Sequence, residues 1–340
     1  MKTKLAFKGK SRPYLAAVLV LLGAVVLLLL MIISITQGAA KIPYSMVVNA
    51  FLDFDRENPR HLLVIDMRLP RVLAAALVGS ALAVSGALMQ GMTRNPLADS
   101  GLMGLSSGAG LALAVCVAYL TKVGYSQIIV ITFFGAAFGA GAVYIISSLI
   151  PGGNSPLKLV LAGATVSTLF SALSQGIAIM TKVSRNVFFW TMGNVSGTDW
   201  KQIMAVMPVI LLALAGAVAL SRSITLLSMG DEVASGLGLR TGLVKAMGTV
   251  LVVLLAGTSV ALAGMISFVG IVIPHITRFL VGADYRMIIP VSAILGAVLL
   301  VAADLGAKTL AAPTELPIGA LIAVLGVPVF LYFARRQHGS

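Results

Sequence analysis

One stretch of the sequence, residues 257–285, constrains the fold more than any other, because it is an apolar run with repeated breaks. Its interruptions are Gly264, Gly270 and Pro274, and two ionisable residues, His275 and Arg278, lie inside it. Helix breakers at membrane depth are tolerated where neighbouring protein or a watery cavity satisfies the freed backbone groups. A simple anchor has no need of them, so the stretch indicates a multi-helix transporter.

The composition places the whole chain in the same class. Hydrophobic residues make up 59% of the 340 residues and charged residues only 10%, whereas soluble domains carry about 25% charged residues. The period-2 alternation of barrel strands is absent, which excludes an outer-membrane barrel. The chain is therefore expected to be an all-α integral membrane protein.

A spanning helix needs roughly 20 mostly apolar residues, and the sequence offers about ten such segments. They are Tyr14–Thr36, Val72–Met89, Leu102–Leu120, Ile128–Ile150, Leu157–Met180, Ile203–Leu220, Leu243–Ala263, Ile266–Val281, Ile288–Ala303 and Leu316–Phe333. Two of them, Ile266–Val281 and Ile288–Ala303, are short. We expect one transmembrane domain over residues 14–335, a basic tail over 1–13 and a C-terminal tail over 336–340.

An even number of spans puts both termini on one side. The N-terminal tail carries five Lys and Arg residues and no acid, and Arg335 and Arg336 lie near the other end. The positive-inside rule therefore places both termini in the cytoplasm. With this topology the cytoplasmic segments hold 14 Lys and Arg, against 10 for the external segments.

Signs of catalysis or metal binding are missing from the sequence. Gly9-Lys10-Ser11 has the end of a nucleotide-binding loop but lacks its first glycine, since residue 4 is lysine. The three histidines lie far apart, so no metal cluster is expected, and the single cysteine, Cys116, excludes an internal disulfide. We expect a chain without enzymatic activity or bound cofactor. If ATP drives transport, ATP and Mg²⁺ are bound by another chain.

A set of short motifs carries a family resemblance. In order they are Arg68-Leu69-Pro70-Arg71, the glycine-rich run from Gly79 to Gly91, Arg94-Asn95-Pro96-Leu97-Ala98, Pro274-His275-Ile276-Thr277-Arg278, Gly282-Ala283-Asp284-Tyr285-Arg286, Glu315-Leu316-Pro317-Ile318-Gly319 and Gly326-Val327-Pro328. Over residues 14–335 the chain resembles the FecCD-type permeases of ABC importers for ferric siderophores, haem and cobalamin. In style it is most similar to the ferric siderophore permeases of Gram-positive bacteria.

The resemblance implies a type II ABC importer in the bacterial cytoplasmic membrane. Its partners would be a second permease, identical or paralogous, two cytoplasmic ATPase subunits, and an extracytoplasmic binding protein or lipoprotein that delivers the ligand. A ferric siderophore is favoured over haem or cobalamin. The alternative of an ion-coupled secondary transporter predicts carboxylates at mid-span and inverted repeats, but the acids of this chain lie mostly at span ends.

For the external face, the resemblance implies that Arg68, Arg71 and Lys308 dock the binding protein. Exposed arginines suit that role because they pair with carboxylates through two parallel hydrogen bonds. Alternatively, they anchor the helix at the lipid interface. Asp304 and Glu315 also belong to this side and could pair with any of the three cations, and the sequence does not choose between these pairings.

For the cytoplasmic face, the resemblance implies that a segment at about 228–241 couples the permease to the ATPase. Its residues are Gly230, Asp231, Glu232, Ala234, Gly236, Leu237 and Gly238. We expect two short helices broken by a glycine, with the two acids near a helix start, where the helix dipole favours them. The alternative is a plain loop.

Residues of the translocation path are harder to predict. Met89 and Met92, with Met103 and Met180, are candidates for an adaptable lining, although methionine is more often core packing. His275 and Arg278 could act in gating or could simply stabilise a helix end. The pairs Gly104/Gly108 and Gly135/Gly139 predict close helix packing, within the chain or at a subunit interface.

Overall fold

The computed structural model describes residues 12–38, 40–120, 123–149, 156–312 and 314–338. Within these ranges all regular structure is helical, as predicted. The basic tail over 1–13 lies almost wholly outside the described residues.

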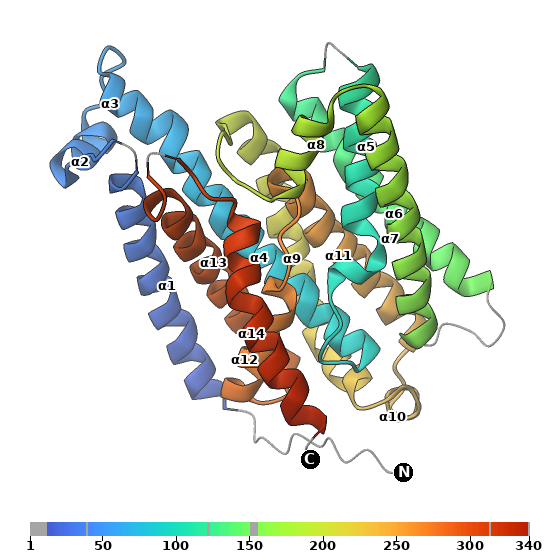
Figure 1. Ribbon diagram of the computed structural model, residues 1–340. Helices are drawn as coiled ribbons and strands as arrows, with labels where there is room; N and C mark the ends of the chain where they lie inside the picture. Colours follow the sequence, from blue (N-terminus) through green and yellow to red (C-terminus); the bar gives the residue numbers. More distant parts are fainter. Residues whose placement is uncertain (1–11, 39, 121–122, 150–155, 313, 339–340) are drawn as a thin grey trace.

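Ten helices of this described part form the bundle (Figure 1). They are α1 (Pro13–Thr36), α4 (Leu69–Thr93), α5 (Leu105–Tyr119), α6 (Tyr125–Leu149), α7 (Pro156–Met180), α9 (Trp200–Ser228), α11 (Thr241–Ala263), α12 (Val269–Val281), α13 (Tyr285–Thr309) and α14 (Ile318–His338). Seven are long and apolar enough to cross a membrane, and α5, α12 and α14 supply shorter apolar helices. The prediction of about ten helices is confirmed.

Short elements that the span count did not include lie at the two ends of the bundle. They are α2 (Tyr44–Leu52), α3 (Pro59–Leu62), the π-helical turn η1 (Leu63–Arg68), the 3₁₀ turn η2 (Ser100–Met103), α8 (Ser184–Thr191) and α10 (Asp231–Gly236). Figure 1 shows α2, α3 and α8 at one end and α10 at the other. We call the end with α10 the inner end and the opposite end the outer end.

The expectation of two short spans is half right. Helix α12 has only 13 residues, since the chain from Gly264 to Phe268 is not helical, and Phe268 itself has a φ of 68°. Helix α13, however, has 25 residues and is not short. It continues past Ala303 because the charges of Asp304 and Lys308 are paired inside the bundle. A prediction from hydropathy alone ends the span just before those charges.

Helix α4 is the centre of the fold and packs against α9, α11, α12 and α13. Its closest approach to α13 is at Gly79 and Gly296, where a Cβ on either residue would collide with the backbone carbonyl of the other. The predicted glycine pairs lie in a second crossing, between α5 and α6. A Cβ at Gly108 would strike Gly135 and Gly139. Close packing of these glycines within the chain is thus confirmed.

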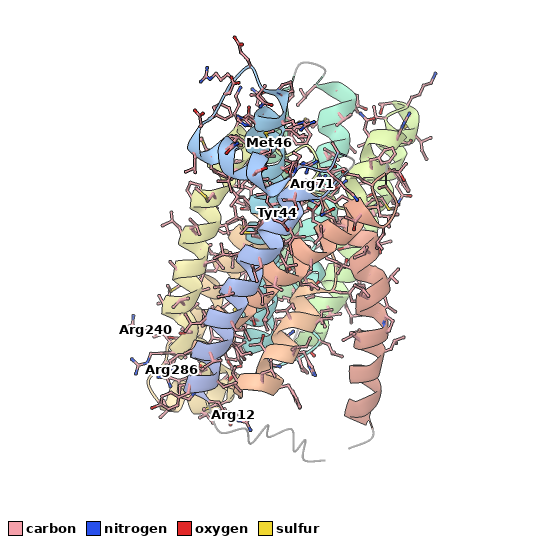
Figure 2. The ribbon with its side chains drawn as sticks, turned by 90° about the vertical axis from the view of Figure 1, so that its left-hand side faces the viewer. Arg12, Tyr44, Met46, Arg71, Arg240 and Arg286 are labelled. Carbon is pink, nitrogen blue, oxygen red and sulfur yellow. The ribbon has the colours of Figure 1, made fainter. Side chains whose placement is uncertain are left out.

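The ends of the bundle also differ in charge. Figure 2 shows Arg12, Arg240 and Arg286 at the inner end, and Arg71 with Tyr44 at the outer end. The start of α1 and the end of α14 both lie at the inner end, as an even number of spans requires (Figure 1). The positive-inside rule identifies this inner end with the cytoplasmic side.

Candidate functional site

A charged cluster joins four segments at the outer end. Arg71 on α4 donates from Nε to Asp304 on α13 at 2.8 Å and from Nη1 to Glu315 at 2.8 Å. Lys308, one turn after Asp304, lies 3.2 Å from the same carboxylate. The pairing that the sequence left open is therefore specific: Arg71 binds both acids, and Lys308 binds Asp304.

Arg68 is not part of that cluster. Its guanidinium donates to the backbone carbonyls of Ile35 and Ala40, and so it holds the end of α1 and the chain that follows. Lys308 does the same from the other side, since Nζ donates to the carbonyl of Ser34 at 2.9 Å and to its Oγ at 2.6 Å. Both cations satisfy carbonyls that the end of helix α1 leaves without a donor.

The expectation that the three docking residues are exposed is wrong. The exposed fraction is 9% for Arg68 and 5% for Lys308, and 11% for the Arg71 side chain. Buried charges in proteins are normally paired or hydrogen-bonded. Arg71 and Lys308 are paired with acids, and Arg68 is hydrogen-bonded to backbone carbonyls. Glu315 is the open member of the group, with its side chain 38% exposed. A partner would therefore meet Arg71 and Glu315 first.

At the inner end, the predicted coupling segment forms one short helix rather than two. Gly230, with a φ of 123°, precedes α10, and Gly238, with a φ of 82°, follows it. The Leu239 amide donates to the Ala234 carbonyl at 3.0 Å and the Gly238 amide to Ser235 at 2.9 Å. This is the hydrogen-bond pattern of a glycine-terminated helix. The predicted second short helix is not formed: Leu237 to Arg240 is non-helical, and the next helix, α11, begins at Thr241.

Helix α10 is fastened to the bundle through Asp231. Its carboxylate binds Lys245 of α11 at 2.8 Å and Arg94, at the end of α4, at 3.4 Å. Asp231 and Glu232 occupy the first turn of α10, where the helix dipole favours them. Ala234 is fully buried against the bundle.

On the opposite side, α10 and its flanking residues carry apolar side chains that are exposed among the described residues. Met229, Val233 and Leu237 follow one another at four-residue spacing and are 61%, 49% and 63% exposed. Helix α10 lies at the inner end of the bundle (Figure 1). Exposed apolar groups at a water-facing end are typical of a surface that binds another protein.

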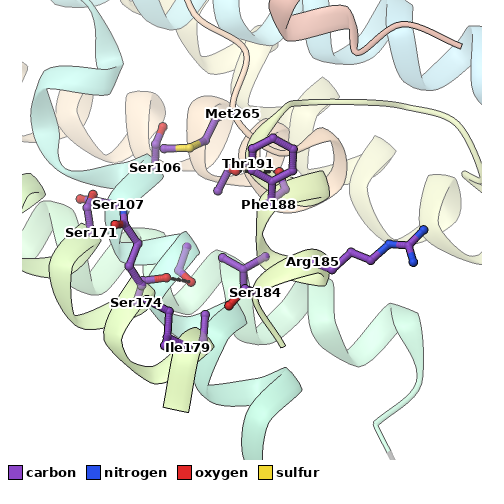
Figure 3. A pocket seen from close by; sticks show the side chains of 14 residues that line it. Ser106, Ser107, Ser171, Ser174, Ile179, Ser184, Arg185, Phe188, Thr191 and Met265 are labelled. Atoms are coloured by element: carbon purple, nitrogen blue, oxygen red, sulfur yellow. Dashed lines mark hydrogen bonds between the residues drawn. The ribbon is translucent and has the colours of Figure 1, made fainter. Parts of the chain in front are cut away.

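A cavity of about 500 Å³ lies between α5, α7 and α8, with Met265 of the non-helical segment at its edge (Figure 3). Most of its polar lining is hydroxyl and amide: Ser106, Ser107, Ser171, Ser174, Gln175, Ser184 and Thr191. Among the described residues that line it, Arg185 is the one charged side chain. Figure 3 shows the Arg185 guanidinium at the rim, directed away from the serines.

Two of the hydroxyls that line this cavity already donate their hydrogens to backbone carbonyls. Ser174 donates its hydrogen to the Gly110 carbonyl at 3.1 Å, and Ser107 donates to Gly104 at 3.1 Å. Each hydroxyl then keeps only acceptor lone pairs for a ligand. Apart from the hydroxyls, the surface of the cavity is mainly apolar.

Sequence reasoning missed this cavity, although a signal was present. Ser167, Ser171, Ser174 and Gln175 recur on α7 at spacings of four, three and one, so they form one polar stripe along a mainly apolar helix. The spacing of three and four residues is that of one helix face. A stripe of hydroxyls facing α5 and α8 could have been read from it.

The methionines predicted as candidates for the lining of the translocation path differ in burial. Met89 and Met92 are 2% and 9% exposed and pack in the main hydrophobic core on α4, so they do not line the cavity. Met103 is buried as well, while Met180 is 84% exposed. In this conformation Met89 and Met92 pack in the core, as methionine more often does, and their role in the path stays a prediction.

His275 and Arg278 lie on α12, half-buried. Arg278 occupies the last turn of the helix, as the helix-end alternative requires, and donates to Gln90 on α4 and to Tyr285 on α13, each at 3.0 Å. These bonds tie α12 to two neighbours. Arg278 is therefore a structural residue in this conformation.

The loop between α12 and α13 carries a second tie at the inner end. Asp284 caps α13, accepts a hydrogen bond from Thr225 of α9 and pairs with Arg286 at 2.8 Å. Burial by itself raises the pKa of the Asp284 carboxyl, but the bonds and charge of Arg286 outweigh it and hold the pKa below its usual value.

The comparisons with known proteins agree with this architecture. The model of the FecCD transport family matches residues 26–336. The chain is 46% identical over 334 residues to the iron(3+)-hydroxamate import system permease protein FhuB of Bacillus subtilis, covering 96% of this chain and 85% of that protein. It is 39% identical over 285 residues to the hemin transport system permease protein HmuU of Yersinia pestis, covering 81% and 83%.

The fold has a solved counterpart. A structure described as an inward-facing conformation of a metal-chelate type ABC transporter superposes with a TM-score of 0.81 at 27% identity, over 93% of this chain and 98% of the other. The family match spans nearly all of the bundle, from α1 to α14. The chain is therefore a multi-pass membrane protein that belongs to the FecCD transport family.

Proposed function

We propose that this chain is the permease subunit of an ATP-driven importer that carries a ferric siderophore across the bacterial cytoplasmic membrane. The observation that carries the proposal is the 46% identity, over 96% of the chain, to a permease named for iron(3+)-hydroxamate import. A neutral or anionic, oxygen-rich iron chelate also suits a cavity whose described lining has hydroxyls, one arginine and no carboxylate.

In this proposal the chain itself hydrolyses nothing and binds no cofactor. Two ATPase subunits hold ATP and Mg²⁺ at the inner end, and a second permease, identical or paralogous, completes the path. Met229, Val233 and Leu237 are the apolar contacts that α10 offers to an ATPase, with Glu232 beside them. The ion pairs of Asp231 hold α10 in place for that contact.

At the outer end, an extracytoplasmic binding protein delivers the ligand. Arg71 is the docking residue that the proposal favours, because it reaches the surface beside Glu315. Arg68 and Lys308 stabilise the structure around Arg71, since their side chains are bound to the end of α1. The docking role of this group is thus concentrated on one arginine.

Uptake of radiolabelled iron by a strain lacking its own siderophore permeases tests the function. The chain is expressed with the ATPase, second permease and binding protein of its importer, and a panel of ferric hydroxamates, ferric catecholates, ferric citrate, haem and cobalamin is supplied. We expect uptake of at least one ferric siderophore, abolished by an inactive ATPase. Uptake of haem or cobalamin alone would show that this compound, and not a ferric siderophore, is the substrate. Uptake that survives loss of the ATPase would favour an ion-coupled transporter.

A further inference from the structure

Helix α12 contains a built-in gap in its hydrogen bonding. Pro274 lies inside the helix and has no N–H, so the carbonyl of Gly270, four residues earlier, loses its helical donor. Gly270 is buried in the bundle, where water is not at hand to replace that donor. A buried carbonyl without a partner is unfavourable.

The missing donor is supplied by another helix. Gln90 of α4, 2% exposed, donates from Nε2 to the Gly270 carbonyl at 3.2 Å and lies 3.4 Å from the Ile271 carbonyl. Its Oε1 accepts from Arg278 at 3.0 Å. Carbonyls only accept and a guanidinium only donates, so the amide satisfies both sides in this orientation alone.

The sequence places Gln90 at this gap through a matched spacing. On α4, Gly86 and Gln90 are four residues apart, and on α12 Gly270, Pro274 and Arg278 repeat at the same interval. The two helices touch at Gly86 and Gly270, where a Cβ on Gly86 would collide with the Gly270 carbonyl. One turn further along, Gln90 reaches the carbonyl that Pro274 leaves free.

Further hydrogen bonds and an ion pair extend from this contact, through Arg278 on α12 and through Arg94 at the end of α4. Arg278 also donates to the hydroxyl of Tyr285 at 3.0 Å, and the Tyr285 amide donates to Thr225 of α9 at 3.0 Å. On α4, Arg94 lies one turn beyond Gln90 and pairs with Asp231 of α10. The last turn of α4 therefore bonds to the predicted coupling helix with one side chain and to α12 with the other.

We propose that Gln90 is a positioning residue for transport: its amide replaces the hydrogen bond that Pro274 removes and fixes α12 to the turn of α4 that holds α10. This inference rests on the proposed function, because it assigns α10 to the ATPase. When Gln90 is replaced, we expect ATP still to be hydrolysed, but α12 no longer moves together with α4.

The test uses the complete importer in proteoliposomes, with ferric-siderophore uptake and ATPase activity measured together. Gln90→Leu removes both bonds, Gln90→Glu keeps the acceptor for Arg278 but loses the donor to α12, and Pro274→Ala restores the backbone donor. We expect Gln90→Leu and Gln90→Glu to lower uptake per ATP about tenfold, as for one unpaired buried acceptor. ATPase activity should stay within about twofold, since the ATPase surface is not altered.

The pairing of Gln90 with Pro274 gives the decisive comparison. In the Pro274→Ala background, Gln90→Glu should cost no more than about twofold, because the carbonyl has its own donor again and the acceptor for Arg278 is kept. An equal loss in both backgrounds, or a parallel loss of uptake and ATPase activity, overturns the proposal. If Pro274→Ala is itself inactive, Gln90→Glu decides, since normal uptake by that variant shows that the donor is not needed. Failure of the unmodified importer to transport would count against the proposed function instead.

Discussion

Asp304 is the residue on which the outer end depends most. It is fully buried and its carboxylate is bound by both Arg71 and Lys308. Those two cations in turn tie α4 and α1 to α13. A buried charge pair adds little net stability over an apolar pair, but removal of one member leaves the others uncompensated.

Asp304→Asn is therefore expected to destabilise the protein by about 3 kcal/mol, since two buried cations lose their common counter-charge. Cys116 is the only cysteine and is 1% exposed, so a thiol-reactive dye reports unfolding of the detergent-solubilised chain. Glu315→Gln is the matched control. Its side chain is 38% exposed, and the expected cost is about 0–1 kcal/mol. Equal unfolding temperatures for the two variants would contradict the role given to Asp304.

The sequence offered Asp304 and Glu315 as partners for these cations, but it could not predict which pairs form. The motifs singled out Arg68, Arg71 and Lys308, but Arg71 and Asp304 are 233 residues apart, and Glu315 lies further still. Only the packing of α4 on α13 through Gly79 and Gly296 brings them together. The burial of the three cations follows from that packing, and it is why the expectation of exposed docking residues failed.

At the scale of elements, the turn after α10 depends on backbone conformation. Gly238 has a φ of 82°, and a Cβ there would meet open space. Gly236 lies in the helix itself, has no positive φ and also faces open space. The two glycines differ only in the conformation that the backbone requires.

Gly238→Ala should weaken binding of the ATPase, because alanine in a left-handed conformation costs about 1–2 kcal/mol and the turn that ends α10 shifts. Gly236→Ala should leave binding unchanged, since alanine is the better helix former. Co-purification of the ATPase with each variant measures the difference. If both variants retain the ATPase equally, the shape of this turn does not contribute to coupling.

Hydropathy predicted the long elements well and the short ones poorly, for a physical reason. A run of 20 apolar residues marks a span wherever it occurs, so α1, α6, α7 and α11 lie close to their predicted bounds. Helix α9 continues to Ser228, eight residues beyond the predicted end at Leu220. Short helices such as α8 have no such run, and α12 begins at Val269 because Phe268 departs from the helical conformation. That departure depends on the neighbouring segments and not on local composition.

For the whole molecule, the outer and inner ends are joined by a single helical rod. From Pro59 the chain is helical through Thr93, and 78% of its most apolar window is buried. The rod carries Arg71 near one end, while Arg94 caps its other end. If Arg71 docks the binding protein and α10 binds the ATPase, as proposed, docking and coupling act on opposite ends of the same element, and Glu315 competes with the docking partner for Arg71.

Glu315→Gln should accordingly tighten binding of the binding protein by about two- to fivefold, the effect of one exposed ion pair released. Asp53→Asn removes the same charge from an exposed position at the same end without touching Arg71, and it should have a smaller effect. Binding to the permease in nanodiscs, measured at low and physiological salt, separates the two variants. Weaker binding by Glu315→Gln would mean that Glu315 contacts the partner itself.

The central position of α4 also has a consequence for how the protein is made. Its packing partners begin at Trp200, 107 residues after its own end at Thr93. At about 5–20 residues per second, synthesis of that interval takes roughly 5–20 s. During this time the second helix to enter the membrane carries Gln90 and Arg71 without their partners, so nascent chains that stop before α9 should keep α4 in contact with the insertion machinery.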